Sequence, residues 1–116
     1  MKFLLSLHLV FVSSAVLFGG SLPPEALNFT RTYCYECHAG KEKDLEGDVR
    51  LDIKAIDWES SQSIDLWKTI HEVVKSMDMP PSDAERSPDS AQREEFLQWI
   101  ESALTKHSPP GGTLPR

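Results

Sequence analysis

The chain contains only two cysteines, and they lie three residues apart with a histidine directly after the second, in the segment Cys34-Tyr35-Glu36-Cys37-His38. Two thiols exclude a multi-bridge disulfide scaffold and any zinc site that needs three or four thiolates. The C-x-x-C-H spacing is typical of c-type haem attachment, because residues three apart share a helix face and two thiols can then bond two vinyl groups along one porphyrin edge. The adjoining His38 is then held beneath the ring, where its imidazole can bind the iron. The motif therefore predicts one covalently attached haem c.

Two other uses of these residues remain open from the sequence. Cys34 and Cys37 could form a redox-active dithiol or a small disulfide, although no strand pattern precedes Cys34, as a thioredoxin-like site requires. A zinc ion bound by Cys34, Cys37 and His38 would need His71 or a distant carboxylate as its fourth ligand. Adjacent cysteine and histidine ligands fit the usual zinc spacings badly, so the spacing favours haem.

The N-terminus has the pattern of an export signal over residues 1–21. Lys2 provides the basic start, an apolar stretch follows from Phe3 to Phe18, and the small residues Gly19, Gly20 and Ser21 end it. The apolar stretch is shorter than the roughly 20 residues that span a bilayer comfortably. We therefore expect an exported protein, located in the periplasm, with an uncleaved N-terminal tether facing the periplasm as the alternative.

The 116 residues are 40% hydrophobic and 26% charged, which is typical of a globular domain. The formal net charge is −6, and it becomes −7 without residues 1–21, whose only charged side chain is Lys2. This acidic balance and the lack of basic runs exclude nucleic acid as an expected partner. The charge instead predicts a redox protein partner with a basic docking surface.

Apolar spacing predicts an all-α domain over residues 22–107, followed by a flexible Pro/Gly-rich tail at 108–116. A first helix is expected over residues 25–33, then an ordered loop over 39–61 with its apolar side packed inward. Ser63 is the expected N-cap of a second helix, which Pro80 ends. Ser87 is the expected N-cap of the last helix, with Pro88 at its first position. The apolar stripes of these three helices comprise Ala26, Phe29 and Tyr33; Ile64, Trp67, Ile70, Val74 and Met77; and Phe96, Leu97, Trp99, Ile100, Ala103 and Leu104.

Three residues are candidates for a second iron ligand: Met77, Met79 and His71. A thioether sulfur is a soft, neutral ligand that favours ferrous iron. Met79 is preferred because Pro80 and Pro81 stiffen its turn, whereas Met77 belongs to the apolar stripe of the preceding helix. His71 is interpreted as a packed or solvated helix residue.

The order of these motifs resembles the planctomycete-type cytochrome c domain. The resemblance depends on the segment from Phe29 to His38, on Gly47, Leu51-Asp52 and Trp67, and on Met79-Pro80-Pro81 and Phe96-Leu97-Gln98-Trp99-Ile100. It extends from about Pro24 to Leu104. It implies a small all-α fold of three to four helices around haem, with the first and last helices crossing near Phe29 and Trp99. It also implies thioethers at Cys34 and Cys37, a proximal ligand at His38 and a distal ligand at Met79.

The expected function is one-electron transfer by a haem c protein with His38 and Met79 as iron ligands. No substrate is transformed, so the protein is not expected to be an enzyme. The alternative is a haem-based sensor, or a subunit of a larger redox enzyme, with an open distal site.

Overall fold

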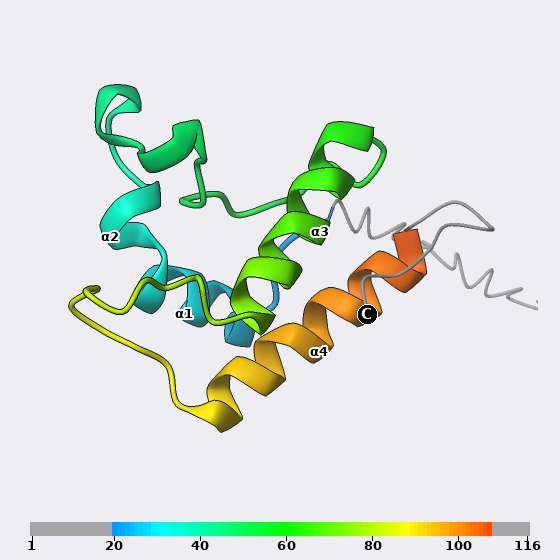
Figure 1. Ribbon diagram of the computed structural model, residues 1–116. Helices are drawn as coiled ribbons and strands as arrows, with labels where there is room; N and C mark the ends of the chain where they lie inside the picture. The colour runs from blue at the N-terminus through cyan, green and yellow to red at the C-terminus, as the bar shows by residue number, and fades with distance from the viewer. Residues whose placement is uncertain (1–19, 108–116) are drawn as a thin grey trace, which may run out of the picture.

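The computed structural model describes residues 20–107 and confirms the expected all-α fold (Figure 1). Most of the expected export signal and all of the expected tail, residues 108–116, lie outside this range. Between residues 20 and 107 the chain forms no β-strand, and the only β-type pairing is an isolated antiparallel bridge between Ser21 and Ala55. The elements are, in chain order, α1 (Pro24–Tyr33), α2 (Tyr35–His38), two short 3-10 turns η1 (Glu42–Asp44) and η2 (Glu46–Asp48), α3 (Ser61–Lys75) and α4 (Ser90–His107).

Helix α1 begins as the sequence predicts. Pro24 occupies its first turn, where a missing N–H costs nothing, and Glu25 lies near the positive end of the helix dipole. Ala26, Phe29 and Thr30 are buried. The Phe29 ring stacks on Phe96 of α4, with 3.9 Å between ring centroids and 9° between planes. The first and last helices therefore pack together near Phe29, as expected.

The segment between α2 and α3 is an ordered loop, as predicted. Gly40 and Gly47 have positive φ angles of 95° and 63°, which glycine adopts without steric cost. Leu51 and Ile56 are buried, so the loop does pack its apolar side inward. The amide of Ile56 donates to the Gly20 carbonyl and the amide of Leu22 to the Lys54 carbonyl, which joins this loop to the entry of α1.

Helix α3 begins earlier than predicted, because Ser60 and not Ser63 is its N-cap. The Ser60 hydroxyl accepts a hydrogen bond from the Ser63 amide at 3.3 Å, the usual N-cap contact with the third helical residue. The helix also ends earlier, at Lys75. Met77 therefore does not belong to the apolar stripe as expected; it has a φ of 67° and is 67% exposed.

Helix α4 begins later than predicted, because Asp89 takes the capping role expected of Ser87. The Asp89 carboxylate accepts from the Gln92 amide at 2.7 Å, and the Asp89 amide donates to the Gln92 side chain at 3.0 Å. This reciprocal pair is a capping box, which satisfies two backbone donors at once. Ser87 and Pro88 lie before the helix.

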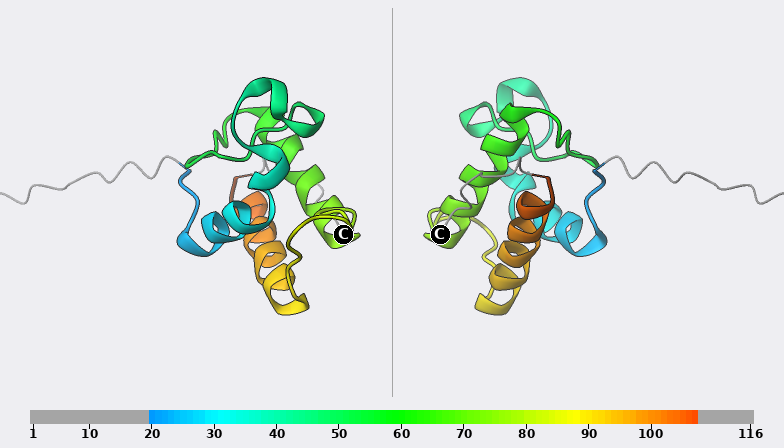
Figure 2. Two further views of the ribbon diagram at one scale, coloured as in Figure 1. Left: turned by 90° about the vertical axis from the view of Figure 1, so that its left-hand side faces the viewer. Right: turned by 90° about the vertical axis from the view of Figure 1, so that its right-hand side faces the viewer.

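The core joins α1, α3, α4 and the 39–60 loop in one cluster of buried side chains: Leu22, Ala26, Phe29, Leu51, Ile56, Trp67, Ile70, Val74, Phe96, Leu97, Ile100 and Leu104. In both side views of Figure 2 the connection after α2 lies at one end of the molecule and the start of α4 at the other. None of the helices within residues 20–107 combines the length and hydropathy that crossing a bilayer requires.

Candidate functional site

A cavity of about 480 Å³ lies where α2, α3 and the two long connections meet. Figure 1 shows these connections on the same side of the molecule as α2. The volume is in the range of ligand pockets, roughly 300–1,000 Å³. The cavity is lined by Phe29, Tyr33, Cys34, Glu36, Cys37, His38, Glu46, Val49, Leu51, Leu66, Thr69, Ile70, Val73, Val74, Met79, Pro80, Pro81, Asp83 and Ala84. All four residues predicted for the haem site are therefore on its wall.

The two cysteines are positioned by the junction between α1 and α2. The Cys34 amide still donates to the Thr30 carbonyl at 2.9 Å, as in a continuing α1. The amides of Cys37 and His38 in turn donate to the Cys34 carbonyl, at 3.3 and 3.0 Å. One turn of backbone thus separates the two thiols, as the spacing predicts.

The imidazole of His38 is held by a contact that the sequence does not reveal. Its Nδ1 lies 3.1 Å from the Val49 carbonyl oxygen, and because a carbonyl only accepts, Nδ1 carries the proton. This leaves the lone pair of Nε2 for a metal, the arrangement in which a carbonyl fixes the tautomer of a ligating histidine. The Leu51 amide also donates to the His38 carbonyl at 2.7 Å, so the loop after α2 holds both ends of this residue.

Both cysteines are free in the folded chain. Burial raises the pKa of the Cys34 thiol from 9.0 to about 12. Burial and the nearby carboxylates Glu36, Glu46 and Asp83 raise the pKa of the Cys37 thiol. Reactive dithiols have lowered pKa values in electropositive surroundings, so this environment disfavours the dithiol alternative.

Met79 lines the cavity, whereas Met77 does not. The Met79 amide donates to the Val73 carbonyl at 2.9 Å, so its backbone is fixed against the end of α3. The Met79 side chain is 39% exposed. Met79 is thus the one methionine among residues 20–107 that lies on the same cavity as His38.

His71 lies away from this cavity. Its side chain is fully buried between α3 and α4, and its Nε2 lies 2.8 Å from the carboxylate of Glu101. This confirms that His71 is a packed helix residue. Residues 20–107 contain no group of three or more His, Cys, Asp or Glu side chains arranged to hold a metal ion, so the zinc alternative finds no ligand set there.

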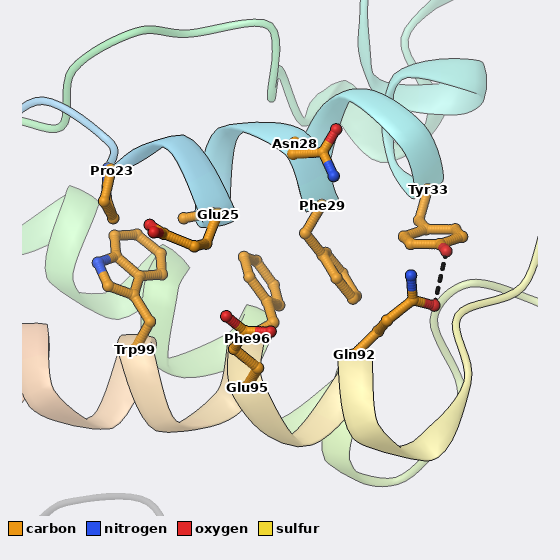
Figure 3. A pocket seen from close by; sticks show the side chains of 10 residues that line it. Pro23, Glu25, Asn28, Phe29, Tyr33, Gln92, Glu95, Phe96 and Trp99 are labelled. Atoms are coloured by element: carbon orange, nitrogen blue, oxygen red, sulfur yellow. Dashed lines mark hydrogen bonds between the residues drawn. The ribbon is translucent and has the colours of Figure 1, made fainter.

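A second and smaller cavity, of about 290 Å³, lies between α1 and α4. Figure 3 shows Phe29 and Phe96 facing each other there, and the Tyr33 hydroxyl donating to the Gln92 side chain at 2.8 Å. Trp99 also lines this cavity, next to Pro23. No cysteine or histidine lines it, so it offers neither a thiol for haem attachment nor an imidazole for haem iron.

The residues of the larger cavity fit a covalently held haem. Two free thiols are available for thioether bonds, one imidazole nitrogen is available for iron, and the walls are largely apolar. A small helical fold around such a cavity is the arrangement expected of a cytochrome c domain.

The family within that class follows from the sequence. The family model described as Planctomycete cytochrome C matches residues 34–83, which contain all four predicted haem-site residues. This match agrees with the resemblance seen in the sequence, and the matched family implies a redox function with covalently bound haem c. The comparisons with curated proteins and with solved structures found no match.

Proposed function

We propose that the protein is a one-electron carrier with one haem c, bonded through Cys34 and Cys37 and with iron ligated by His38 and Met79. The observation that supports this most directly is that His38 and Met79, from segments 41 residues apart, line one apolar cavity. No substrate is transformed, so the protein is not an enzyme by itself.

When bound, the haem supplies a one-electron couple between ferric and ferrous iron. The chain tunes this couple through its own residues. The thioether of Met79 is a soft, neutral donor that favours ferrous iron. The Val49 carbonyl, as acceptor for His38 Nδ1, increases the basicity of that imidazole. The largely apolar walls would limit the contact of the haem with water.

The attachment is tested by producing the full chain in cells that mature c-type cytochromes. We expect one haem per chain in a pyridine haemochrome assay. Cys34→Ser and Cys37→Ser should each lose a thioether bond, and His38→Ala should lose the proximal ligand. Met79→Ala should retain covalent haem, because Met79 takes no part in attachment. A colourless wild-type product from such cells would refute the proposal.

The alternative, a haem-based sensor or enzyme subunit with an open distal site, is favoured by one observation. The Met79 side chain is 39% exposed, so a small ligand has access to its position. Absorption spectra distinguish the two functions. A methionine-ligated ferric protein shows a weak sulfur-to-iron charge-transfer band at long wavelength, and an open site does not. Rapid binding of carbon monoxide by the reduced wild-type protein, without that band in the oxidised protein, would favour the sensor.

The partner that suits this site is a redox protein with a basic docking surface. Glu36, Glu46 and Asp83 line the cavity next to Cys37, so part of the negative charge behind the chain's net −6 lies at the site. Complementary charge accelerates association, and salt screens it with a Debye length of about 8 Å at physiological ionic strength.

We expect electron transfer to a basic redox protein to slow as salt is added. Glu46→Lys combined with Asp83→Lys should slow it further and flatten the salt dependence. Glu59→Lys combined with Asp65→Lys is the matched control, because it changes the net charge equally at two exposed residues that do not line the cavity. An electron-transfer rate that changes neither with added salt nor in the double variant would contradict this choice of partner.

Export to the periplasm is part of the proposal, with an N-terminal tether as the alternative form. Deletion of residues 2–21 should keep the protein in the cytoplasm and prevent haem attachment. The mass of the mature protein and its distribution between soluble and membrane fractions distinguish a cleaved signal from a tether. Haem attachment to the deleted form would contradict the export requirement.

A further inference from the structure

Arg93 is a charged side chain in the apolar face of α4. It is only 9% exposed and precedes the buried residues Phe96 and Leu97 by three and four positions. The ion pairs among the described residues are Arg50 with Asp52 and His71 with Glu101, so no carboxylate there pairs with Arg93. A buried charge is costly unless hydrogen bonds satisfy it, so the contacts of this guanidinium have a structural purpose.

The guanidinium of Arg93 bonds to two backbone carbonyls from different segments. Its Nη1 donates to the carbonyl oxygen of Val74, in the last turn of α3, at 2.8 Å. The same nitrogen donates to the carbonyl oxygen of Met79 at 3.0 Å. Arg93 thus joins α4 to the end of α3 and to the loop that carries Met79. Hydrogen bonds from a charged donor are stronger than neutral ones.

The backbone of Met79 is therefore fixed on both sides. Its amide donates to the Val73 carbonyl at 2.9 Å, and its carbonyl accepts from Arg93. Met79 is 39% exposed, so the contacts of its backbone carry much of what fixes its position. Backbone contacts must then determine where the sulfur can reach.

We propose that Arg93 is a positioning residue of the distal site, which holds the Met79 backbone where its thioether can bind iron. This inference rests on the proposed ligation by His38 and Met79. Because loss of the contact frees the loop, the methionine-bound state becomes a smaller fraction of the ensemble, and a competing ligand then binds more tightly in proportion.

The test uses the full-length holoprotein and imidazole as the competing ligand of ferric iron. Arg93→Met removes both hydrogen bonds while keeping an unbranched apolar stem. We expect it to retain covalent haem, to show a weaker sulfur-to-iron charge-transfer band and to bind imidazole about tenfold more tightly, which corresponds to about 1.4 kcal/mol. Arg86→Met is the control, since Arg86 is exposed in the connection between α3 and α4 that carries Met79 and does not line the cavity. The control should bind imidazole as the wild type does.

Arg93→Lys keeps the charge, but the lysine ammonium lies one bond closer to the backbone than Nη1 of Arg93 and reaches the Val74 and Met79 carbonyls less well, so we expect an intermediate imidazole affinity. If Arg93→Met does not accumulate as folded protein, the imidazole affinity of Arg93→Lys tests the positioning role instead. Wild-type imidazole affinity in either folded Arg93 variant would overturn the positioning role.

Met79→Ala distinguishes a failure of the proposed iron ligation from a failure of the positioning role of Arg93. If Met79→Ala binds imidazole more tightly than the wild type while the Arg93 variants do not, Met79 is the ligand and only the role of Arg93 is refuted. If Met79→Ala and the wild type behave alike, Met79 is not the ligand, and the proposed ligation and the inference fail together.

Discussion

Asp52 holds the loop after the haem-attachment motif in shape through its carboxylate. This carboxylate accepts from the Gly40 amide at 3.2 Å and from the Arg50 guanidinium at 2.8 Å. Arg50 also donates to the Gly40 carbonyl at 2.8 Å, so the three residues close the base of the loop. The Gly40 amide, and then Arg50, lower the pKa of Asp52 from its usual 3.8.

The lowered pKa of Asp52 predicts an acid-dependent contribution to stability. A carboxylate whose folded pKa lies below its unfolded pKa stabilises the folded state fully above the unfolded value, and this contribution is lost as pH falls through the folded value. Asp52→Asn should therefore weaken the dependence of the unfolding free energy on pH below about 4. Urea unfolding of the holoprotein at a series of pH values measures this pH dependence. Asp44→Asn, at an exposed position in η1, should leave that dependence as it is in the wild type.

Phe96 is the aromatic residue that connects α1, α3 and α4 in the core. It is 3% exposed, stacks on Phe29 and lies 6.4 Å from Trp67 between ring centroids. Phe96→Ala should lower the free energy of unfolding by about 3–5 kcal/mol, because it removes buried apolar surface and leaves a void. Thermal or urea unfolding measures the loss. Gln98→Ala, on the exposed side of α4, should change stability by less than about 0.5 kcal/mol; equal losses would contradict this assignment of the core.

At the scale of elements, the start of α4 depends on the capping box between Asp89 and Gln92. The Gln92 side-chain oxygen accepts from the Asp89 amide and also from the Tyr33 hydroxyl of α1. The cap therefore also fixes α4 against the end of α1. This helix start lies close to Arg93, whose amide donates to the Asp89 carbonyl at 3.0 Å.

Removal of the cap should destabilise the protein measurably. Asp89→Ala is expected to lower the free energy of unfolding by about 1 kcal/mol, because the Gln92 amide loses its partner at the helix end. Asp89→Ser should recover most of this loss, because a serine hydroxyl can accept the same bond. Chemical unfolding of the holoprotein measures both variants, and identical stability of alanine and serine at this position would show that the cap contributes nothing.

At the scale of the whole molecule, the cavity proposed for haem borders directly on the hydrophobic core. Its wall includes Leu51, Ile70 and Val74, which are also buried residues of the hydrophobic cluster. A domain of this size buries only about 60–65% of its unfolded surface, so a tightly held cofactor supplies contacts that the chain alone cannot. The binding free energy of the haem then becomes folding free energy.

The apo chain is therefore expected to be mostly unfolded. Circular dichroism of a Cys34→Ser/Cys37→Ser protein, compared with the wild-type holoprotein, should show a large loss of helical signal. The double variant changes two side chains by one atom each, so the loss reports on haem and not on packing. Two equally helical spectra would show that the chain folds without its cofactor.

Local patterns in the sequence were sufficient to predict the helices and four residues that line the larger cavity. The all-α class, the first helix and the inward-packed loop are confirmed, because each depends on spacing along a few turns of chain. The prediction that Met77 belongs to an apolar stripe was wrong, since the helix ends at Lys75. Both predicted N-caps were displaced by two or three residues, because several serines and aspartates near each helix start can accept the same bond.

The sequence by itself determined the attachment motif, the family of residues 34–83 and the charge of the protein. Only the tertiary structure decided which atoms hold His38 and Met79, because the Val49 carbonyl and the Arg93 guanidinium reach them from distant segments. A carbonyl belongs to every residue and leaves no pattern in a sequence. Arg93 did leave one, a charge at core spacing on α4, but its partners became known only when α3, α4 and the Met79 loop were brought together.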